Sequence, residues 1–175
     1  MVGRQTQGSV AAHHPDERPD DGGDRARRPP VILYLETSSL VKVYVVEAGS
    51  EDVRALVKRA ALVTTSLIAY PEVRAAFARR RRDRTLRPAD FTMVKRDFEA
   101  DWPAYVAVEV TAAVCQEAGD LAERYRLRGF DSIHLASFAE MVRGVGSAEA
   151  RFSSFDERLN RAAAALARTL RSSVP

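Results

Sequence analysis

Four acidic residues stand at comparable places in the predicted fold, and their positions indicate one site. Glu36 directly follows an apolar segment at 31–35, Glu72 lies just inside the helix after 62–65, Asp131 opens a helix, and Asp156 directly follows 151–155. Sites in open parallel sheets form beyond the carboxyl ends of the strands. We therefore expect the four carboxylates to converge on one rim of the sheet.

Clustered carboxylates repel one another, and they stay ionised together only when a cation neutralises them. Carboxylate oxygens are hard ligands, which select Mg²⁺ or Mn²⁺. A cation held in this way activates water and stabilises charge on a phosphoryl group. The chemistry that this pattern predicts is metal-assisted hydrolysis of a phosphodiester.

Each acid also has a simpler interpretation. Asp131 and Asp156 are good N-caps for helices, and Glu72 could pair with Arg74 or Arg79 on the helix surface. Glu36 ends a buried apolar strand, so its charge needs a partner in either interpretation.

The elements that must position these acids alternate along the chain. Apolar or alternating segments predict strands, and segments of helical period predict helices between them. This order is typical of an α/β fold, in which helices cover a parallel sheet. The predicted strands are 31–35, 62–65, 105–110 and 151–155. The predicted helices are 38–46, 50–60, a long helix that ends at about 84, one that begins at Pro88, 114–125, 131–143 and one that begins at Asp156. We expect the long helix either to be kinked at Pro71 or to begin there.

The chain of 175 residues, 46% of them apolar, suits one folded domain preceded by a different segment. Residues 1–30 contain four of the eight prolines, four of the nine glycines and no aromatic residue. Such a composition cannot bury enough apolar surface to fold. We interpret 1–30 as a disordered tail, or as a start codon assigned too far upstream, and 31–172 as the domain.

Several classes of protein are excluded or disfavoured. No apolar run approaches the roughly 18 residues of a membrane span, and no charged-then-apolar leader opens the chain. The single cysteine, Cys115, excludes an internal disulfide framework. Neither a P-loop nor a Rossmann glycine pattern is present. These features favour a cytoplasmic protein without a nucleotide cofactor.

A run of arginines follows Glu72 on the same predicted helix. Six of nine residues between 79 and 87 are arginine, although the whole chain has a net charge of only +3. The run is either a contact for RNA phosphates, with Arg79, Arg80, Arg82 and Arg84 as candidates, or a solvated helix end.

His134 also has two interpretations. It is either a packed, hydrogen-bonded residue, or a metal ligand or proton carrier.

The local sequences around the acids resemble a known family. Residues 34–42 (YLETSSLVK), 67–76 (LIAYPEVRAA), 129–136 (GFDSIHLA) and 152–159 (FSSFDERL) are similar to four segments of PIN-domain ribonucleases, especially the VapC-type toxins of type II toxin–antitoxin pairs. All four segments occur in the family's order, and the resemblance covers about residues 31–170. It implies a PIN-like three-layer α/β/α sandwich with a central, mostly parallel sheet.

The resemblance also implies roles for the acids. In the family an acidic quartet binds Mg²⁺ or Mn²⁺ and cleaves single-stranded regions of RNA. Glu36 and Asp131 would ligate the metal first, while Glu72 and Asp156 would hold the metal or its waters, or ligate a second ion; the candidate metal ligands are thus Glu36, Asp131 and Asp156. Thr37 and Ser154 look like the family's small hydroxyl residues, which orient a carboxylate or a water. Glu36 is a departure, because the family usually has Asp there.

The function that the resemblance implies is a Mg²⁺- or Mn²⁺-dependent endoribonuclease, the toxin of a VapBC-type pair. It further implies a homodimer, a VapB-type antitoxin that blocks the site, and contact with DNA only through that antitoxin. Two alternatives stay open. The chain could be a catalytically weak PIN-fold module that binds RNA or an antitoxin, or it could be a hydrolase of small phosphates.

Overall fold

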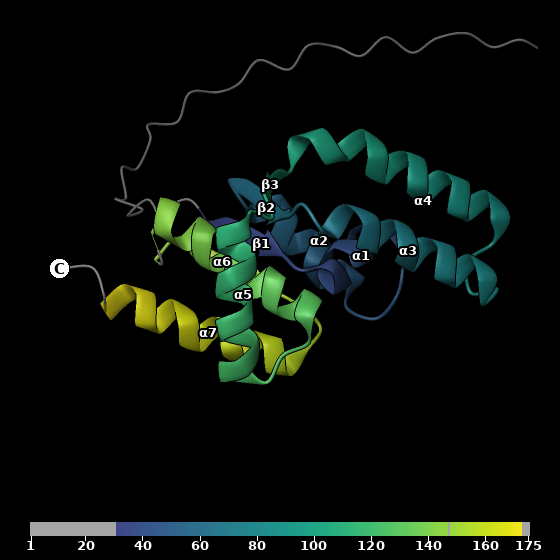
Figure 1. Ribbon diagram of the computed structural model, residues 1–175. Helices are drawn as coiled ribbons and strands as arrows, with labels where there is room; N and C mark the ends of the chain where they lie inside the picture. Colours follow the sequence, from purple (N-terminus) through teal and green to yellow (C-terminus); the bar gives the residue numbers. More distant parts are fainter. Residues whose placement is uncertain (1–30, 147, 173–175) are drawn as a thin grey trace, which may run out of the picture.

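A four-stranded parallel sheet lies at the centre of the protein (Figure 1). The computed structural model describes residues 31–146 and 148–172. Within these residues the strand order is β3-β2-β1-β4, and every neighbouring pair is parallel. The strands are β1 (Ile32–Leu35), β2 (Leu62–Ser66), β3 (Val106–Val108) and β4 (Ala150–Ser153). The predicted parallel sheet is confirmed; the interpretations of 1–30 fall outside the described residues.

The helices fall where the periodicity of the sequence places them, with small differences at their ends. They are α1 (Thr37–Tyr44), α2 (Ser50–Arg59), α3 (Ala69–Arg82), α4 (Pro88–Asp101), α5 (Ala112–Tyr125), α6 (Gly129–Val145) and α7 (Glu157–Ser172), with a 3-10 turn at Trp102–Ala104. None of the helices in the described part of the chain is long and apolar enough to cross a membrane.

Two prolines lie in the first turns of helices, at different positions. Pro88 is the first residue of α4, as predicted, because its fixed backbone suits that position. The expectation that the preceding helix begins at Pro71 is wrong, since α3 begins two residues earlier. Pro71 is tolerated because the first four N–H groups of a helix have no partner within it.

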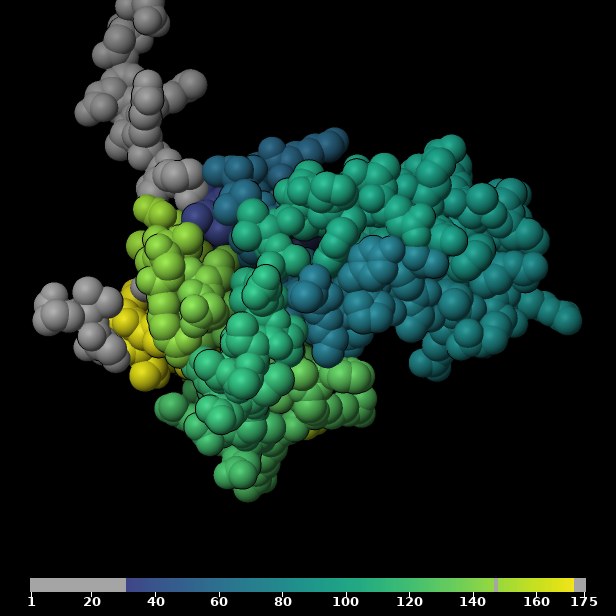
Figure 2. All heavy atoms as spheres, turned by 45° about the horizontal axis from the view of Figure 1, so that its top comes forward, coloured from purple at the N-terminus to yellow at the C-terminus, as the bar shows by residue number. Residues whose placement is uncertain are grey.

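Helices cover both faces of the sheet, which confirms the three-layer sandwich. Successive side chains of a strand point to opposite faces, and β1 illustrates this: Leu33 and Leu35 lie in one core, whereas Tyr34 lies in the other. The first core is formed with α1 to α4 and the second with α5 to α7. Figure 1 shows these two groups of helices on opposite sides of the strands, and in Figure 2 the teal atoms of α3 and α4 project to one side, away from the green helices α5 and α6. The central strand therefore serves two separate cores.

One glycine is required by the backbone. Gly49, directly before α2, has a φ of +84°. A Cβ atom at this position would lie 2.5 Å from Cε1 of Phe155, which is too close for two carbon atoms. Both the left-handed conformation and the close approach of Phe155 thus favour glycine.

We expect Gly49→Ala to lower the free energy of unfolding by about 1–2 kcal/mol, because alanine is strained in the left-handed region. Gly119→Ala is the matched control. Gly119 lies inside α5, where an added methyl group would meet nothing within 4 Å, so alanine should raise the stability by about 0.5–1 kcal/mol. Urea unfolding of both variants measures the difference, and an unchanged midpoint for Gly49→Ala would contradict the expectation.

Candidate functional site

The carboxyl ends of β1 and β4 meet where the chain changes direction across the sheet. From β1 the chain adds β2 and β3 on one side, and it then returns to place β4 on the other side of β1. Such a switch point leaves a crevice outside the strand ends in open α/β sheets. The backbone N–H of Glu36 donates to the Ser153 carbonyl at 3.0 Å. The first acid therefore lies directly beside the end of β4.

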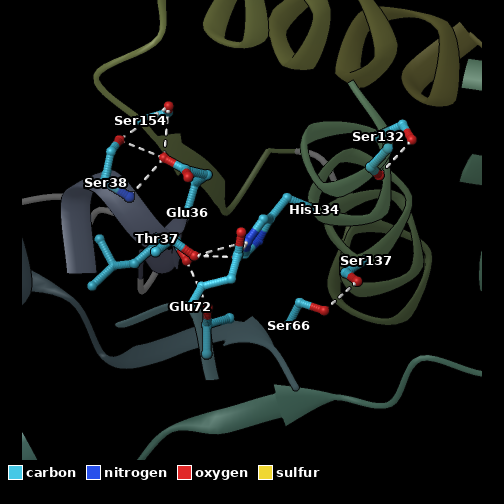
Figure 3. Close-up of polar contacts among 12 residues, drawn as sticks. Glu36, Thr37, Ser38, Ser66, Glu72, Ser132, His134, Ser137 and Ser154 are labelled. Carbon is cyan, nitrogen blue, oxygen red and sulfur yellow. Dashed lines mark hydrogen bonds and ion pairs between the residues drawn. The ribbon is translucent and has the colours of Figure 1, made fainter. Parts of the chain in front are cut away.

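Glu36 is a buried carboxylate held by three donors. Its side chain is the N-cap of α1, and its Oε2 accepts hydrogen bonds from the backbone N–H of Ser38 at 2.9 Å, from Ser154 Oγ at 2.9 Å and from Ser38 Oγ (Figure 3). These donors replace the water that burial removes. Oε1 accepts no hydrogen bond from the described residues, and it is the Glu36 oxygen left for a ligand.

The two serines connect Glu36 to the loop between β4 and α7. Ser38 Oγ accepts the backbone N–H of Phe155 at 2.8 Å, and Ser154 Oγ accepts the backbone N–H of Asp156 at 3.0 Å. Each hydroxyl thus donates to the carboxylate and accepts from the loop. This arrangement fixes the position of Asp156 relative to Glu36.

Glu72 is held by a second set of donors at the same rim. Its Oε2 lies 2.6 Å from Thr37 Oγ1 and 2.9 Å from His134 Nε2 (Figure 3). Nδ1 of that histidine lies 3.0 Å from the Tyr34 hydroxyl. A carboxylate only accepts hydrogen bonds, so Nε2 must donate, and in the neutral ring Nδ1 accepts from Tyr34. The buried ring of His134 is therefore fixed at both nitrogens.

The titration of these groups follows from their contacts. Burial raises the pKa of Tyr34 well above its usual value, which keeps its hydroxyl a donor. Burial also raises the pKa of Glu72, but the hydrogen bonds from His134 and Thr37 and the attraction to His134 outweigh that effect, and the net pKa is lowered. Glu72 is thus held as a carboxylate.

Asp131 and Asp156 form the other side of the rim. Asp131 is the third residue of α6, and burial, followed by the nearby charge of Asp156, raises its pKa. Asp156 Oδ1 accepts the backbone N–H groups of Arg158 at 2.7 Å and Leu159 at 3.0 Å, which caps α7. The two carboxylates are close enough to repel each other, and a cation bound between them would offset that repulsion.

The rim fits a hard divalent cation in its donor chemistry. The candidate ligand oxygens are Oε1 of Glu36 and the carboxylate oxygens of Asp131 and Asp156. Among the described residues, no three acid, histidine or cysteine side chains lie close enough together to surround one metal ion. Mg²⁺ commonly takes only one or two protein carboxylates and keeps several waters. One or two of Glu36, Asp131 and Asp156 would therefore ligate such a cation directly, and the remaining carboxylate would contact its waters.

The arginines of α3 lie away from this rim. Arg80 pairs with Glu47 at 2.8 Å, and Arg79 lies 3.5 Å from Asp83 on the same helix. Arg82 and Arg84 are exposed. The helical rise places Arg82 about 15 Å along the axis from Glu72. The run is therefore at the opposite end of α3 from the acids.

Two of the simpler interpretations of the acids are wrong. Asp131 is not an N-cap, because Arg128 occupies that position of α6. Glu72 contacts neither proposed arginine, since Arg74 pairs with Glu99 and Tyr70 instead. The N-cap interpretation of Asp156 and the packed interpretation of His134 agree with the structure.

Sequence reasoning did not find Ser38 or Tyr34 as part of the site. Ser38 is the second residue of α1 and Tyr34 belongs to a buried strand, and neither type nor spacing distinguishes them from packing residues. Their contacts with Glu36 and His134 depend on the tertiary structure alone.

The lowered pKa of Glu72 has a consequence for stability at low pH. The unfolded chain binds a proton at this residue more readily than the folded chain, so the contribution of Glu72 is present above pH 5 and is lost as the pH falls through about 4 and below. We expect the unfolding free energy of the wild type to fall more steeply between pH 6 and pH 3.5 than that of Glu72→Gln, in urea titrations. Parallel pH profiles would contradict this, and Glu123→Gln serves as the control, because Glu123 is exposed on α5 and forms no ion pair with the described residues.

Comparison with known proteins gives the family. No family model matches the chain. The chain is similar in sequence to two proteins of Mycobacterium tuberculosis: Ribonuclease VapC45 of strain CDC 1551 / Oshkosh and Ribonuclease VapC49 of strain ATCC 25618 / H37Rv. Each is 42% identical over 106 residues, which cover 61% of this chain and 74% of the relative. Together with the parallel sandwich and the acids at its switch point, this similarity places the chain in the VapC family of PIN-domain ribonucleases.

Proposed function

We propose that the protein is a Mg²⁺- or Mn²⁺-dependent endoribonuclease that hydrolyses RNA phosphodiester bonds and acts as the toxin of a VapBC-type pair. One observation carries the proposal: Glu36, Asp131 and Asp156 stand around the switch point of a VapC-family fold, with one oxygen of Glu36 held by the protein and the other left for a ligand.

The residues divide the work of the reaction between them. A bound divalent cation would supply an activated water and charge stabilisation for the phosphoryl group. Glu36, Asp131 and Asp156 would hold the cation, with Glu36 oriented by Ser38 and Ser154.

Glu72 would act beside them on water. Both of its hydrogen bonds end on Oε2, so Oε1 is left for a water molecule. Its lowered pKa keeps it ionised, as a proton acceptor or an orienting acceptor must be. Thr37 and His134 would fix the direction of that oxygen.

The partners follow the family. An RNA substrate and a VapB-type antitoxin are the proposed partners, with a homodimer as the assembly and DNA contact only through the antitoxin. The exposed arginines of α3 and the turn after it are a proposed contact for RNA phosphates. Arg82 and Arg84 form no ion pair with the described acids, whereas Arg79 and Arg80 already contact Asp83 and Glu47.

We expect the purified protein to cleave a labelled single-stranded RNA in Mg²⁺ or Mn²⁺ and not in EDTA. Asp131→Asn should lower the rate by at least about 100-fold, because it removes a charge from the proposed cation site. Asp120→Asn, on the exposed face of α5, is the matched control and should cleave like the wild type. Equal rates for the wild type and Asp131→Asn would contradict the proposed role of the rim. No cleavage of any RNA by folded, antitoxin-free protein would favour the binding-module alternative.

Glu36→Asp tests the departure from the family's usual residue. Shortening the side chain moves the carboxylate oxygens by about 1 Å, a shift that strict octahedral ligation of Mg²⁺ detects. We expect the variant to keep or raise the rate of metal-dependent cleavage, as the family's usual residue is restored. A large loss of rate in both Mg²⁺ and Mn²⁺ would mean instead that Ser38 and Ser154 are arranged for the longer side chain.

A further inference from the structure

Two aromatic residues are left out of both cores of the protein. The chain has seven phenylalanines, five tyrosines and one tryptophan. Eleven of these side chains belong to the two hydrophobic cores or pack against them. The other two, Phe130 and Phe155, are 58% and 48% exposed. Each of them directly precedes an acid of the rim, Asp131 and Asp156.

We propose that Phe130 and Phe155 are stacking platforms for unpaired bases of the RNA on either side of the acidic rim. This inference rests on the proposed function, because it assigns base-binding positions to the same site. Aromatic rings bind single-stranded RNA by stacking on bases that have been released from a helix. Bases held in this way would keep the RNA backbone close to the acids that are proposed to act on it.

The ring of Phe155 is held in place before any ligand binds. Its backbone N–H donates to Ser38 Oγ at 2.8 Å. The ammonium of Lys42 lies over one face of the ring, 4.2 Å from its centroid, so a base would stack on the opposite face. The ring also packs directly against Gly49, because a methyl group at that residue would collide with it. A side chain that is already ordered loses little entropy on binding, which favours a stacking role over an adaptable contact.

Phe130 is presented by the start of a helix. It is the second residue of α6, and Arg128 is the N-cap that precedes it. The fold gains little from its burial, since more than half of its surface is exposed. Its aromatic ring and its place next to a candidate metal ligand, rather than its exposure, are what suit it to contact a base.

Charge around the two rings favours RNA over a neutral apolar partner. Arg126 and Arg128 stand just before Phe130, and Arg158 stands just after Phe155; all three are exposed. Arg158 Nη1 donates to the Arg126 carbonyl at 3.1 Å, so the two loops lie side by side. Carboxylates alone would repel phosphates, and these guanidinium groups supply the opposite charge at the same rim.

The test compares bases with a bare backbone. We would measure binding of a single-stranded RNA and of an abasic oligomer of equal length, by fluorescence anisotropy in EDTA, so that no cleavage occurs. Phe130→Leu and Phe155→Leu keep apolar bulk but remove the ring. Each should weaken binding of the RNA by about 5- to 100-fold and leave binding of the abasic oligomer unchanged. Phe130→Tyr and Phe155→Tyr should restore the preference for bases.

Met93→Leu is the matched control, because Met93 has the same 48% exposure as Phe155 but lies on α4. Circular dichroism and urea unfolding check the fold of each variant. If Phe155→Leu does not fold because of its contact with Gly49, Phe130→Leu still tests the proposal, since Phe130 packs in neither core.

The outcomes separate this proposal from the proposed function. Leucine variants that bind RNA and the abasic oligomer in the wild-type ratio would overturn stacking, whether or not the wild type cleaves RNA. A wild type that prefers bases through the two rings but cleaves nothing would support stacking and oppose the hydrolase. Unchanged RNA binding with altered self-association in sedimentation would overturn stacking, because the rings would then contact a second copy.

Discussion

The buried charge of Glu36 is the constraint on which the rest of the rim depends. A carboxylate with 8% of its surface exposed is unfavourable unless donors surround it. The protein supplies these donors from α1 and from the loop after β4, through Ser38 and Ser154. The same two hydroxyls accept N–H groups of that loop. Satisfying one charge therefore aligns the start of α1 with the approach to α7, and it fixes where Asp156 stands.

Glu36 and Glu72 are both carboxylates removed from water, and the protein holds each of them by hydrogen bonds to one of its two oxygens. In each, the protein's hydrogen bonds converge on Oε2, and Oε1 accepts no hydrogen bond from the described residues. The donors differ in kind: hydroxyl and backbone groups hold Glu36, whereas a buried histidine fixed by Tyr34 helps to hold Glu72. Asp131 has a contrasting environment, in which burial and a neighbouring carboxylate raise its pKa. Neighbouring acids with opposite shifts are typical of functional sites.

Much of the fold could be predicted from the sequence, because its signals are local. The apolar run before Glu36 predicts a buried strand, and Pro88 marks the start of α4. The error at Pro71 has a local cause too, since the first turn of a helix tolerates a proline and the sequence does not say which turn is first. The N-cap interpretation of Asp131 failed because a helix can begin two residues earlier without a side-chain cap.

By itself, the sequence determined the alternation of strands and helices, the four acids at strand and helix ends, and the likeness to PIN-domain ribonucleases. Only the tertiary structure decided which side chains hold those acids. His134 reaches Glu72 across 62 residues of chain, and Ser154 reaches Glu36 across 118. Such contacts are set by the order of parallel strands, which brings distant strand ends to one edge. A residue's periodicity reports which face of an element it occupies, but not which distant element will lie opposite.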